Sequence, residues 1–425
     1  MNRTILFWAS CIALIATSMS FAIRGDIMGD FESEFVLEYI GVTGDMTPDE
    51  VAESEELIKT SLGVISGAAF FTFGLAILFG GPLCDLLGMG LLLRIAALCH
   101  VGGTLLTIFA PNFETVVAAT LIIGVANGLV EAVCNPLIAT IYPNQKAQKL
   151  TLFHAWFPGG IVIGGVAAYV FSQLGWGWQL KMAMLLVPAV IYTVMIFGQK
   201  FPPTERVASG VSMGEMFRAT LARPMFLLVI FMMLFTAATE LGVGQWIANV
   251  YNDVMSGVTA EEATAGVLLL AWGNGLMWAL RQFGSGITHR VTPFSLIALT
   301  APLAGVGLLI CSYAQSPFVW FIGSALLFVG VAYWWPTMLG IASERFPRTG
   351  ALGLAVVGAA GAFSTWLAGP IMGALNDAYG PAELLRIWVV LPVFILAVFG
   401  ALYLWDQSRG GYQAQVEDLG GASPE

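Results

Sequence analysis

The stretch from residue 116 to residue 141 reads VVAATLIIGVANGLVEAVCNPLIATI and carries a single acidic or basic side chain, Glu131. A helix needs about 20 apolar residues to cross the hydrocarbon of a bilayer, so this stretch is long enough to span it. An ionisable group at that depth is costly, and it faces the interior of a helix bundle or a water-filled cavity. The stretch therefore predicts a transmembrane helix that carries a functional carboxyl.

Comparable apolar stretches recur along the whole chain. The 425 residues are 58% hydrophobic and 10% charged, whereas a soluble domain has about a quarter of its residues charged. We therefore expect an all-α membrane protein surrounded by a lipid bilayer. The net charge of −10 argues against a nucleic-acid partner. The twelve predicted spans begin near Ile5, Ser61, Leu91, Val116, Thr151, Lys181, Met225, Ala263, Thr292, Pro317, Gly350 and Leu385.

The basic residues predict how these spans are oriented. With the N-terminus inside, thirteen of the 17 Lys and Arg residues lie at inner ends, as the positive-inside rule requires. We expect a bacterial inner-membrane protein with both termini in the cytoplasm. Residues 1–22 also resemble a signal peptide, whose cleavage would leave eleven spans. The polar Arg24 and Asp26 that follow favour a retained first helix.

A basic segment interrupts the apolar pattern between residues 199 and 224, with six predicted spans on each side. Pro136 and Pro336 lie 200 residues apart, and the segments that begin at Phe79 and Phe283 lie 204 apart, which indicates a duplicated six-helix unit. We therefore predict two pseudo-symmetric six-helix bundles. Their boundaries are 1–199 for the N-terminal bundle, 200–223 for a cytoplasmic linker, 224–405 for the C-terminal bundle and 406–425 for a cytoplasmic tail.

The segment GPLCDLLG at residues 81–88 resembles the G-x-x-x-D-x-x-G loop between the second and third helices of the major facilitator superfamily. The resemblance covers nearly the whole chain and implies two bundles that rock about a central site near the bilayer midplane. It implies gating roles for Asp85 and for Arg94, the one basic residue kept from that loop. At the opposite membrane face, Arg24 and Asp26 either neutralise each other or form a second gate.

The fourth predicted helix carries three polar residues at spacings of four, Asn127, Glu131 and Asn135, which we expect on one helical face. Such a face offers an acid that can hold a proton and amides that can bind hydroxyl groups. Burial disfavours the charged form of a carboxyl, which suits a proton carrier. The alternative is an acid held in a structural hydrogen bond.

The segment EAVCNP at residues 131–136 resembles the E-x-x-x-N-P motif of the fucose permease-like sugar:proton symporters. Residues 149–160 resemble the next helix of that family, with His154 where the family often has a sugar-binding Gln. Glu240, followed by Trp246 and Tyr251, resembles the acid of its seventh helix. Asp26 stands near the place of its helix-one acid. The resemblance implies that Glu131, Asp26 and Glu240 couple transport to protons.

Amide and indole side chains complete the predicted site. Sugars stack their C–H faces on indoles, although tryptophans also form interfacial belts. We assign His100 and Arg281 to packing or cytoplasmic gating. The predicted substrate-binding residues are Asn127, Asn135, His154, Trp156, Gln245, Trp246, Asn249, Trp272 and Asn274.

We therefore expect a monomeric secondary transporter and not an enzyme, because the sequence shows no catalytic or metal-ligand cluster. The expected activity is proton-coupled symport of a monosaccharide or similar neutral polar solute, with no cofactor beyond the coupling ion. Sodium is the alternative ion. Alternative functions are transport of an organic anion drawn to Arg24 and His154, transport of a drug-like compound, and a membrane sensor that transports nothing.

Overall fold

The computed structural model describes residues 1–42, 48–255 and 265–415. Within these ranges the chain is almost entirely helical and contains no strand. Eleven helices there are long and apolar enough to cross a membrane. The remaining expected span is α15 (Ala265–Phe283), which is less apolar because it carries Asn274, Arg281 and Gln282. The predicted twelve-helix, all-α membrane fold is confirmed.

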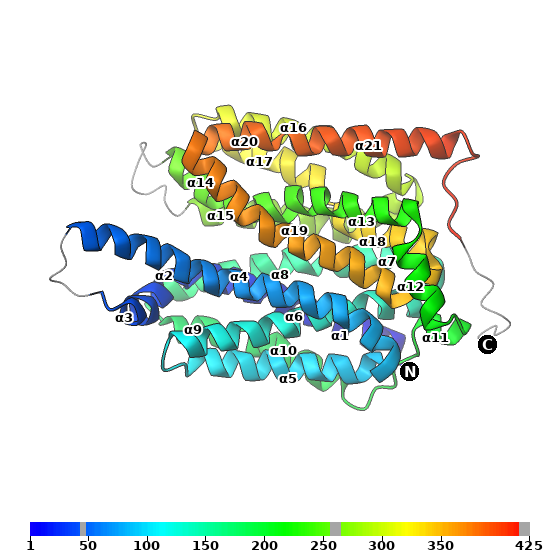
Figure 1. Ribbon diagram of the computed structural model, residues 1–425, viewed down its shortest axis with the longest axis horizontal. Helices are drawn as coiled ribbons and strands as arrows, with labels where there is room; N and C mark the ends of the chain where they lie inside the picture. The colour runs from blue at the N-terminus through cyan, green and yellow to red at the C-terminus, as the bar shows by residue number, and fades with distance from the viewer. Residues whose placement is uncertain (43–47, 256–264, 416–425) are drawn as a thin grey trace.

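The helices before the linker form the N-terminal half. The N-terminus and the last described residues before position 416 lie at one end of the molecule (Figure 1), which we call the terminal end; the opposite end is the far end. The short α2 (Met28–Phe31) and α3 (Leu37–Ile40) lie at the far end. The six spans are α1 (Arg3–Asp26), α4 (Pro48–Leu87), α5 (Met89–Ile108), α6 (Phe113–Ile141), α7 with α8 (Lys146–His154, Trp156–Gln173), and α9 with α10 (Trp178–Ala183, Leu186–Ile196).

The linker contains two short helices, α11 (Glu205–Ser209) and α12 (Met213–Leu221). The C-terminal half follows it. Its spans are α13 (Pro224–Ala237) continuing through the π-helical η3 (Ala238–Gly242) into α14 (Val243–Met255), then α15, α16 (Pro293–Tyr313), α17 with α18 (Pro317–Val331, Trp334–Arg345), α19 (Gly350–Tyr379), and α20 with α21 (Pro381–Trp388, Val390–Gln407).

Local sequence signals explain where several of these helices begin. The side chains of Asn2, Asn112 and Thr292 accept hydrogen bonds from the first-turn N–H groups of α1, α6 and α16, which otherwise have no partner. Proline stands in the first turn of α13, α16, α17 and α20, where its missing N–H costs nothing.

Small residues let the helices approach closely. A Cβ atom on Gly128 of α6 would lie 2.4 Å from the main-chain oxygen of Phe73 on α4, and one on Gly81 of α4 would lie 2.4 Å from the Cβ of Ala355 on α19. Close backbone approach of this kind is how membrane helices gain packing energy without a hydrophobic driving force. The second contact joins the two halves near the terminal end, and α4 and α19 diverge toward the far end (Figure 1).

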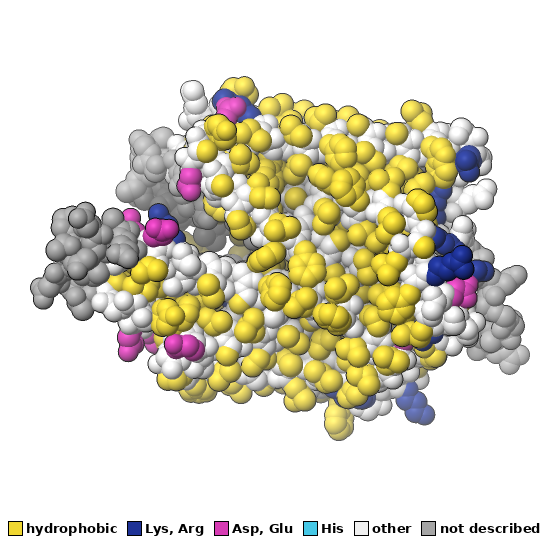
Figure 2. Space-filling view, viewed as in Figure 1, with side chains coloured by type: hydrophobic (Ala, Val, Ile, Leu, Met, Phe, Trp, Pro, Cys, Tyr) yellow, Lys and Arg dark blue, Asp and Glu magenta, His cyan; other side chains and the backbone are white. Residues whose placement is uncertain are grey.

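The outer surface has the polarity of a protein in lipid. Figure 2 shows apolar side chains over the middle of the molecule and charged side chains gathered at its two ends. Large apolar side chains point outward, including Phe197 at 83% exposed and Phe318 at 74%. This surface is unfavourable in water and favourable in hydrocarbon.

Candidate functional site

The fourth and fifth spans bring three buried side chains together. Glu131 and Asn135 lie one turn apart on α6, and the Asn135 amide donates to Glu131 Oε2 over 2.7 Å. His154 ends α7, and its Nε2 lies 2.9 Å from Asn135 Oδ1 and 3.9 Å from Glu131 Oε2. Because an amide oxygen only accepts hydrogen bonds, Nε2 of His154 donates in this contact.

The C-terminal half places an arginine against these residues. Arg281 on α15 is 1% exposed. Its Nη1 donates to the main-chain oxygen of His154 over 2.9 Å, its Nη2 to Glu240 Oε1 over 2.5 Å, and its Nε to the main-chain oxygen of Ala332. Oε2 of Glu240 also accepts the N–H of Trp335 over 3.1 Å. One guanidinium therefore ties the two halves together, and we call Glu131, Asn135, His154, Glu240 and Arg281 the central network.

Proline explains why two main-chain oxygens are available to Arg281. In a helix, the oxygen of residue i accepts from the N–H of residue i+4. Pro158 follows His154 by four residues and Pro336 follows Ala332 by four, and proline has no N–H to give. Both oxygens are thus left without a helical donor, and Arg281 binds both.

Two irregular helix segments position Glu240 and the N–H group of Trp335 that binds it. Glu240 lies in the π-helical η3, where one extra residue per turn widens the helix. Trp335 lies in the first turn of α18, just after the break between α17 and α18, so its N–H is free to bind a carboxylate. Irregular backbone at membrane depth is tolerated where it lies inside the protein, and transporters build their sites from it.

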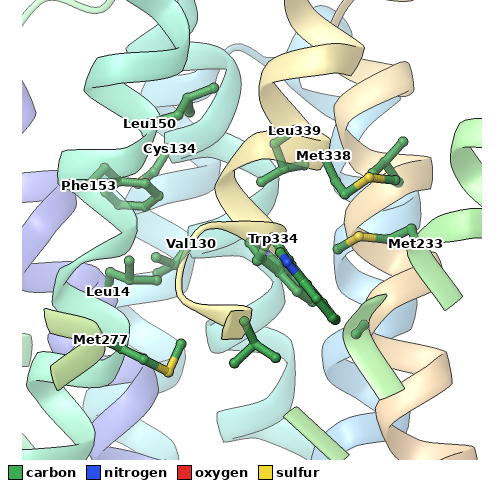
Figure 3. Close-up of a cluster of buried hydrophobic side chains, with 14 of the residues drawn as sticks. Leu14, Val130, Cys134, Leu150, Phe153, Met233, Met277, Trp334, Met338 and Leu339 are labelled. Atoms are coloured by element: carbon green, nitrogen blue, oxygen red, sulfur yellow. The ribbon is translucent and has the colours of Figure 1, made fainter. Parts of the chain in front are cut away.

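The central network is buried, with none of its residues more than 5% exposed, and both halves contribute buried apolar side chains to the core. Figure 3 shows them on both sides of the interface between the halves. Low local polarity strengthens the electrostatic interactions of the enclosed groups and raises the cost of any charge left unpaired. The labelled residues come from α1, α6 and α7 (Leu14, Val130, Cys134, Leu150, Phe153) and from α13, α15 and α18 (Met233, Met277, Trp334, Met338, Leu339).

Asn127 does not join its two predicted partners. Its Oδ1 lies 2.8 Å from His100 Nε2, and its amide donates to Ser20 Oγ over 2.9 Å. His100 Nδ1 in turn lies 2.9 Å from the hydroxyl of Tyr192. This second buried cluster lies among α1, α5, α6 and α10, inside the N-terminal half. The assignment of His100 to packing fits this position.

The predicted indoles and amides of the site are dispersed. Trp156 lies between Trp8 and Trp278, with ring centroids 6.1 and 6.2 Å away. Trp246 packs near Gly373 of α19. Trp272 is 44% exposed and donates to the main-chain oxygen of Phe321 on α17, and Asn274 is buried with its amide bonded to Leu270 within α15. Gln245 and Asn249 belong to α14, but their side chains lie outside the described residues.

Asp26, the acid of the first span, pairs with a lysine and not with Arg24. Asp26 accepts from Lys181 of α9 over 2.6 Å. Arg24 is 5% exposed, and neither of its terminal nitrogens has a hydrogen-bond partner in the part of the chain that the structure describes. The two residues therefore do not neutralise each other.

Asp85 is bound to the linker. It accepts from Arg206 Nε over 2.5 Å and from the hydroxyl of Thr204, which caps α11. Arg94 is exposed on α5. Through Asp85, the last turns of α4 thus anchor the segment that joins the two halves.

The sequence did not indicate that Arg281 belongs to the site: its position near the end of an apolar stretch suggested packing or cytoplasmic gating, and the structure places it buried against Glu240 and His154. Two proline spacings in the sequence could have indicated its partners. Pro158 lies four residues after His154 and Pro336 four residues after Ala332, so each proline leaves a main-chain oxygen without its helical donor. Among the described residues no group of three or more His, Cys, Asp or Glu side chains could hold a metal ion.

The chain is similar in sequence to several known proteins. The family model described as Major Facilitator Superfamily matches residues 6–351. The membrane protein MosC of Rhizobium meliloti is 23% identical over 318 residues, 74% of each chain. A D-xylose transporter of Levilactobacillus brevis is 29% identical over 131 residues, 31% of this chain and 27% of that protein. The galactose-proton symporter of Escherichia coli is 25% identical over 161 residues, 37% of this chain and 34% of that protein. The chain therefore aligns with only 27% and 34% of the length of these two sugar transporters.

Solved structures share the fold over almost the full length. The proton:xylose symporter XylE matches with a TM-score of 0.76 and 13% identity, covering 95% of both chains. The Escherichia coli fucose:proton symporter FucP matches with a TM-score of 0.72 and 15% identity, covering 95% of this chain and 99% of that one. At such identities the likeness establishes the fold alone.

Proposed function

Because the chain belongs to the major facilitator superfamily, we propose that this membrane transporter, which is not an enzyme, is a proton-coupled symporter of a monosaccharide or similar neutral polar solute. It works by alternating access of the two halves to a site at the central network. We further propose a bacterial inner-membrane location with the terminal end in the cytoplasm.

One observation supports proton coupling: two carboxyls are buried near the centre of the molecule, and only one of them forms an ion pair with an arginine in the described part of the chain. Glu240 takes the ion pair with Arg281, at 2.5 Å. Glu131 is equally buried, and its contacts are the neutral amide of Asn135 and the imidazole of His154. A buried carboxylate without a cation is strongly disfavoured, so Glu131 gains most from a bound proton. We propose it as the proton carrier.

Arg281 links this proton to the relative position of the halves. It binds the main-chain oxygen of His154, and the imidazole of that residue lies 3.9 Å from Glu131. When Glu131 releases its proton, the new negative charge attracts Arg281 and competes with Glu240 and Ala332 for it. Those two partners belong to the C-terminal half, as Arg281 does, so the competition loosens contacts within that half and strengthens the attraction across the interface to the N-terminal half. Proton release and movement are thereby coupled.

Support for a sugar comes from chemistry and from relatives. Asn135 and His154 can exchange their mutual hydrogen bond for bonds to hydroxyl groups, and the indoles of Trp156 and Trp278 lie at the interface of α8 and α15. The proteins with similar sequences include a D-xylose transporter and a galactose-proton symporter. We infer a neutral polyhydroxylated substrate.

The test is transport current in proteoliposomes, driven by sugars from a panel at several pH values without sodium. We expect a current that Glu131→Gln abolishes while solute exchange remains. Glu383→Gln is the matched control, because it removes a carboxylate that is 45% exposed and paired with Arg386, away from the central network, and it should keep uphill uptake. Uphill uptake by Glu131→Gln would refute the assignment of Glu131 as the proton carrier. A current that appears only when sodium is present would show that sodium is the coupling ion.

A second candidate is transport of an organic anion. It is favoured by Arg24, whose buried guanidinium has no partner in the described part of the chain. Organic acids in the same panel decide between the two: uptake of an acid that Arg24→Gln abolishes, with no sugar current, would favour the anion.

A further inference from the structure

A hollow of about 720 Å³ opens at the terminal end of the C-terminal half. It lies among the ends of α18 and α21, the start of α13 and the segment after α21. Four arginines, Arg223, Arg345, Arg348 and Arg409, contribute to its wall together with Trp405 and Asp406. This concentration of positive charge stands out in a chain whose net charge is −10.

The arginines are only partly neutralised. Arg345 forms two hydrogen bonds with Asp406, both 2.7 Å long, and Arg348 pairs with Glu215 at 3.0 Å. Arg223 and Arg409 form no ion pair within the described ranges. Two guanidiniums thus remain for a ligand, and the planar donor fork of arginine suits a phosphate group.

The hollow lies at the level where a membrane protein meets lipid headgroups. Leu404, which precedes the lining residue Trp405 in α21, is 67% exposed. The guanidinium of Arg409 lies over the ring of Trp405, 4.5 Å from its centroid, and tryptophan favours the membrane–water interface. Figure 2 shows Lys and Arg side chains at this end, at the border of the apolar surface.

We propose that the hollow binds the headgroup of an anionic phospholipid. Arg223 and Arg409 contact its phosphate, and an acyl chain runs along Leu404 and the ring of Trp405. A basic pocket at a helix end on one membrane face is the kind of site that anionic headgroups occupy. An unattached phosphate would use the same arginines but would gain nothing from the exposed leucine and indole, so the lipid is the occupant that fits both parts of the wall.

The probe is the full chain in phosphatidylcholine vesicles with a minor fraction of phosphatidylglycerol whose acyl chains are brominated. Bromine quenches nearby tryptophan, and the difference between the wild type and Trp405→Phe isolates the emission of Trp405. We expect brominated phosphatidylglycerol to quench this emission more than brominated phosphatidylcholine does. Arg223→Gln/Arg409→Gln should weaken the preference about thirtyfold.

Arg218→Gln/Arg290→Gln is the control, since it removes the same charge from two exposed arginines that do not line the hollow. It should keep the preference. Equal quenching by the two lipids, or an undiminished preference in the first variant, would overturn the proposal. So would inorganic phosphate that changes Trp405 emission in pure phosphatidylcholine vesicles and removes the preference for phosphatidylglycerol, because it would assign the hollow to a free phosphate.

Discussion

Replacing Arg281 by methionine should be among the most damaging single changes in this protein. Methionine keeps much of the volume but leaves the Glu240 carboxylate buried without a cation and the oxygens of His154 and Ala332 without a donor. Removing one partner of a buried pair costs about 3–5 kcal/mol. We therefore expect Arg281→Met to lower the free energy of unfolding by about 4 kcal/mol, roughly a thousandfold in the folding equilibrium.

A double-mutant cycle separates the ion pair from general damage. Glu240→Gln in the Arg281→Met background removes the uncompensated charge, so only the unpaired polar groups remain, at about 1–2 kcal/mol. The double variant should therefore be about 2–3 kcal/mol more stable than Arg281→Met alone. The coupling energy should exceed this difference, because Glu240→Gln alone leaves Arg281 buried without its ion partner and is itself destabilising. The measurement is unfolding in mixed detergent micelles, followed by circular dichroism.

The matched control is the pair Arg386–Glu383, 2.7 Å apart in the same half, with side chains 34% and 45% exposed. Water screens such a pair, and its coupling should stay below about 1 kcal/mol. Equal coupling energies for the buried and exposed pairs would refute the view that Arg281 holds the central network together.

Three further predictions concern the helix contacts around the site. Gly81→Leu should push α4 and α19 apart at the terminal end. Ser343 is buried on α18 and lines a small cavity with Ala351 of α19, so alkylation of Ser343→Cys should then rise several-fold. Gly63→Leu, where an added Cβ meets nothing within 4 Å, should not raise it. Pro336→Ala supplies an N–H to the oxygen of Ala332 and should slow transport about tenfold by competing with Arg281; the same change at Pro302 in α16 should leave the rate unchanged. Asp85→Asn loses its ion pair with Arg206 and should speed proteolysis within residues 200–223, and an unaltered cleavage rate would show that Asp85 does not anchor the linker.

The spans and the family could be predicted from the sequence because both depend on local properties. Apolar stretches of membrane length report the solvent that a segment requires, whatever lies beside it. The contact between Glu131 and Asn135 was also predictable, since four residues make about one helical turn. The same rule explains why Asn127 was misjudged: spacings of four overshoot a turn by about 40°, so across eight residues the side chains diverge by about 80°. Asn127 therefore faces His100 and Ser20.

The sequence by itself determined that this chain is a twelve-helix membrane transporter and that Glu131 is its most notable buried acid. Only the tertiary structure decided which charges meet. Lys181 reaches Asp26 across 155 positions of sequence, and Arg281 reaches His154 across 127. Such pairs depend on how whole helices rotate and pack against one another, and an apolar profile contains no information about that rotation. An arginine at a helix end and an arginine at the centre of a bundle look alike until the neighbouring helices are in place.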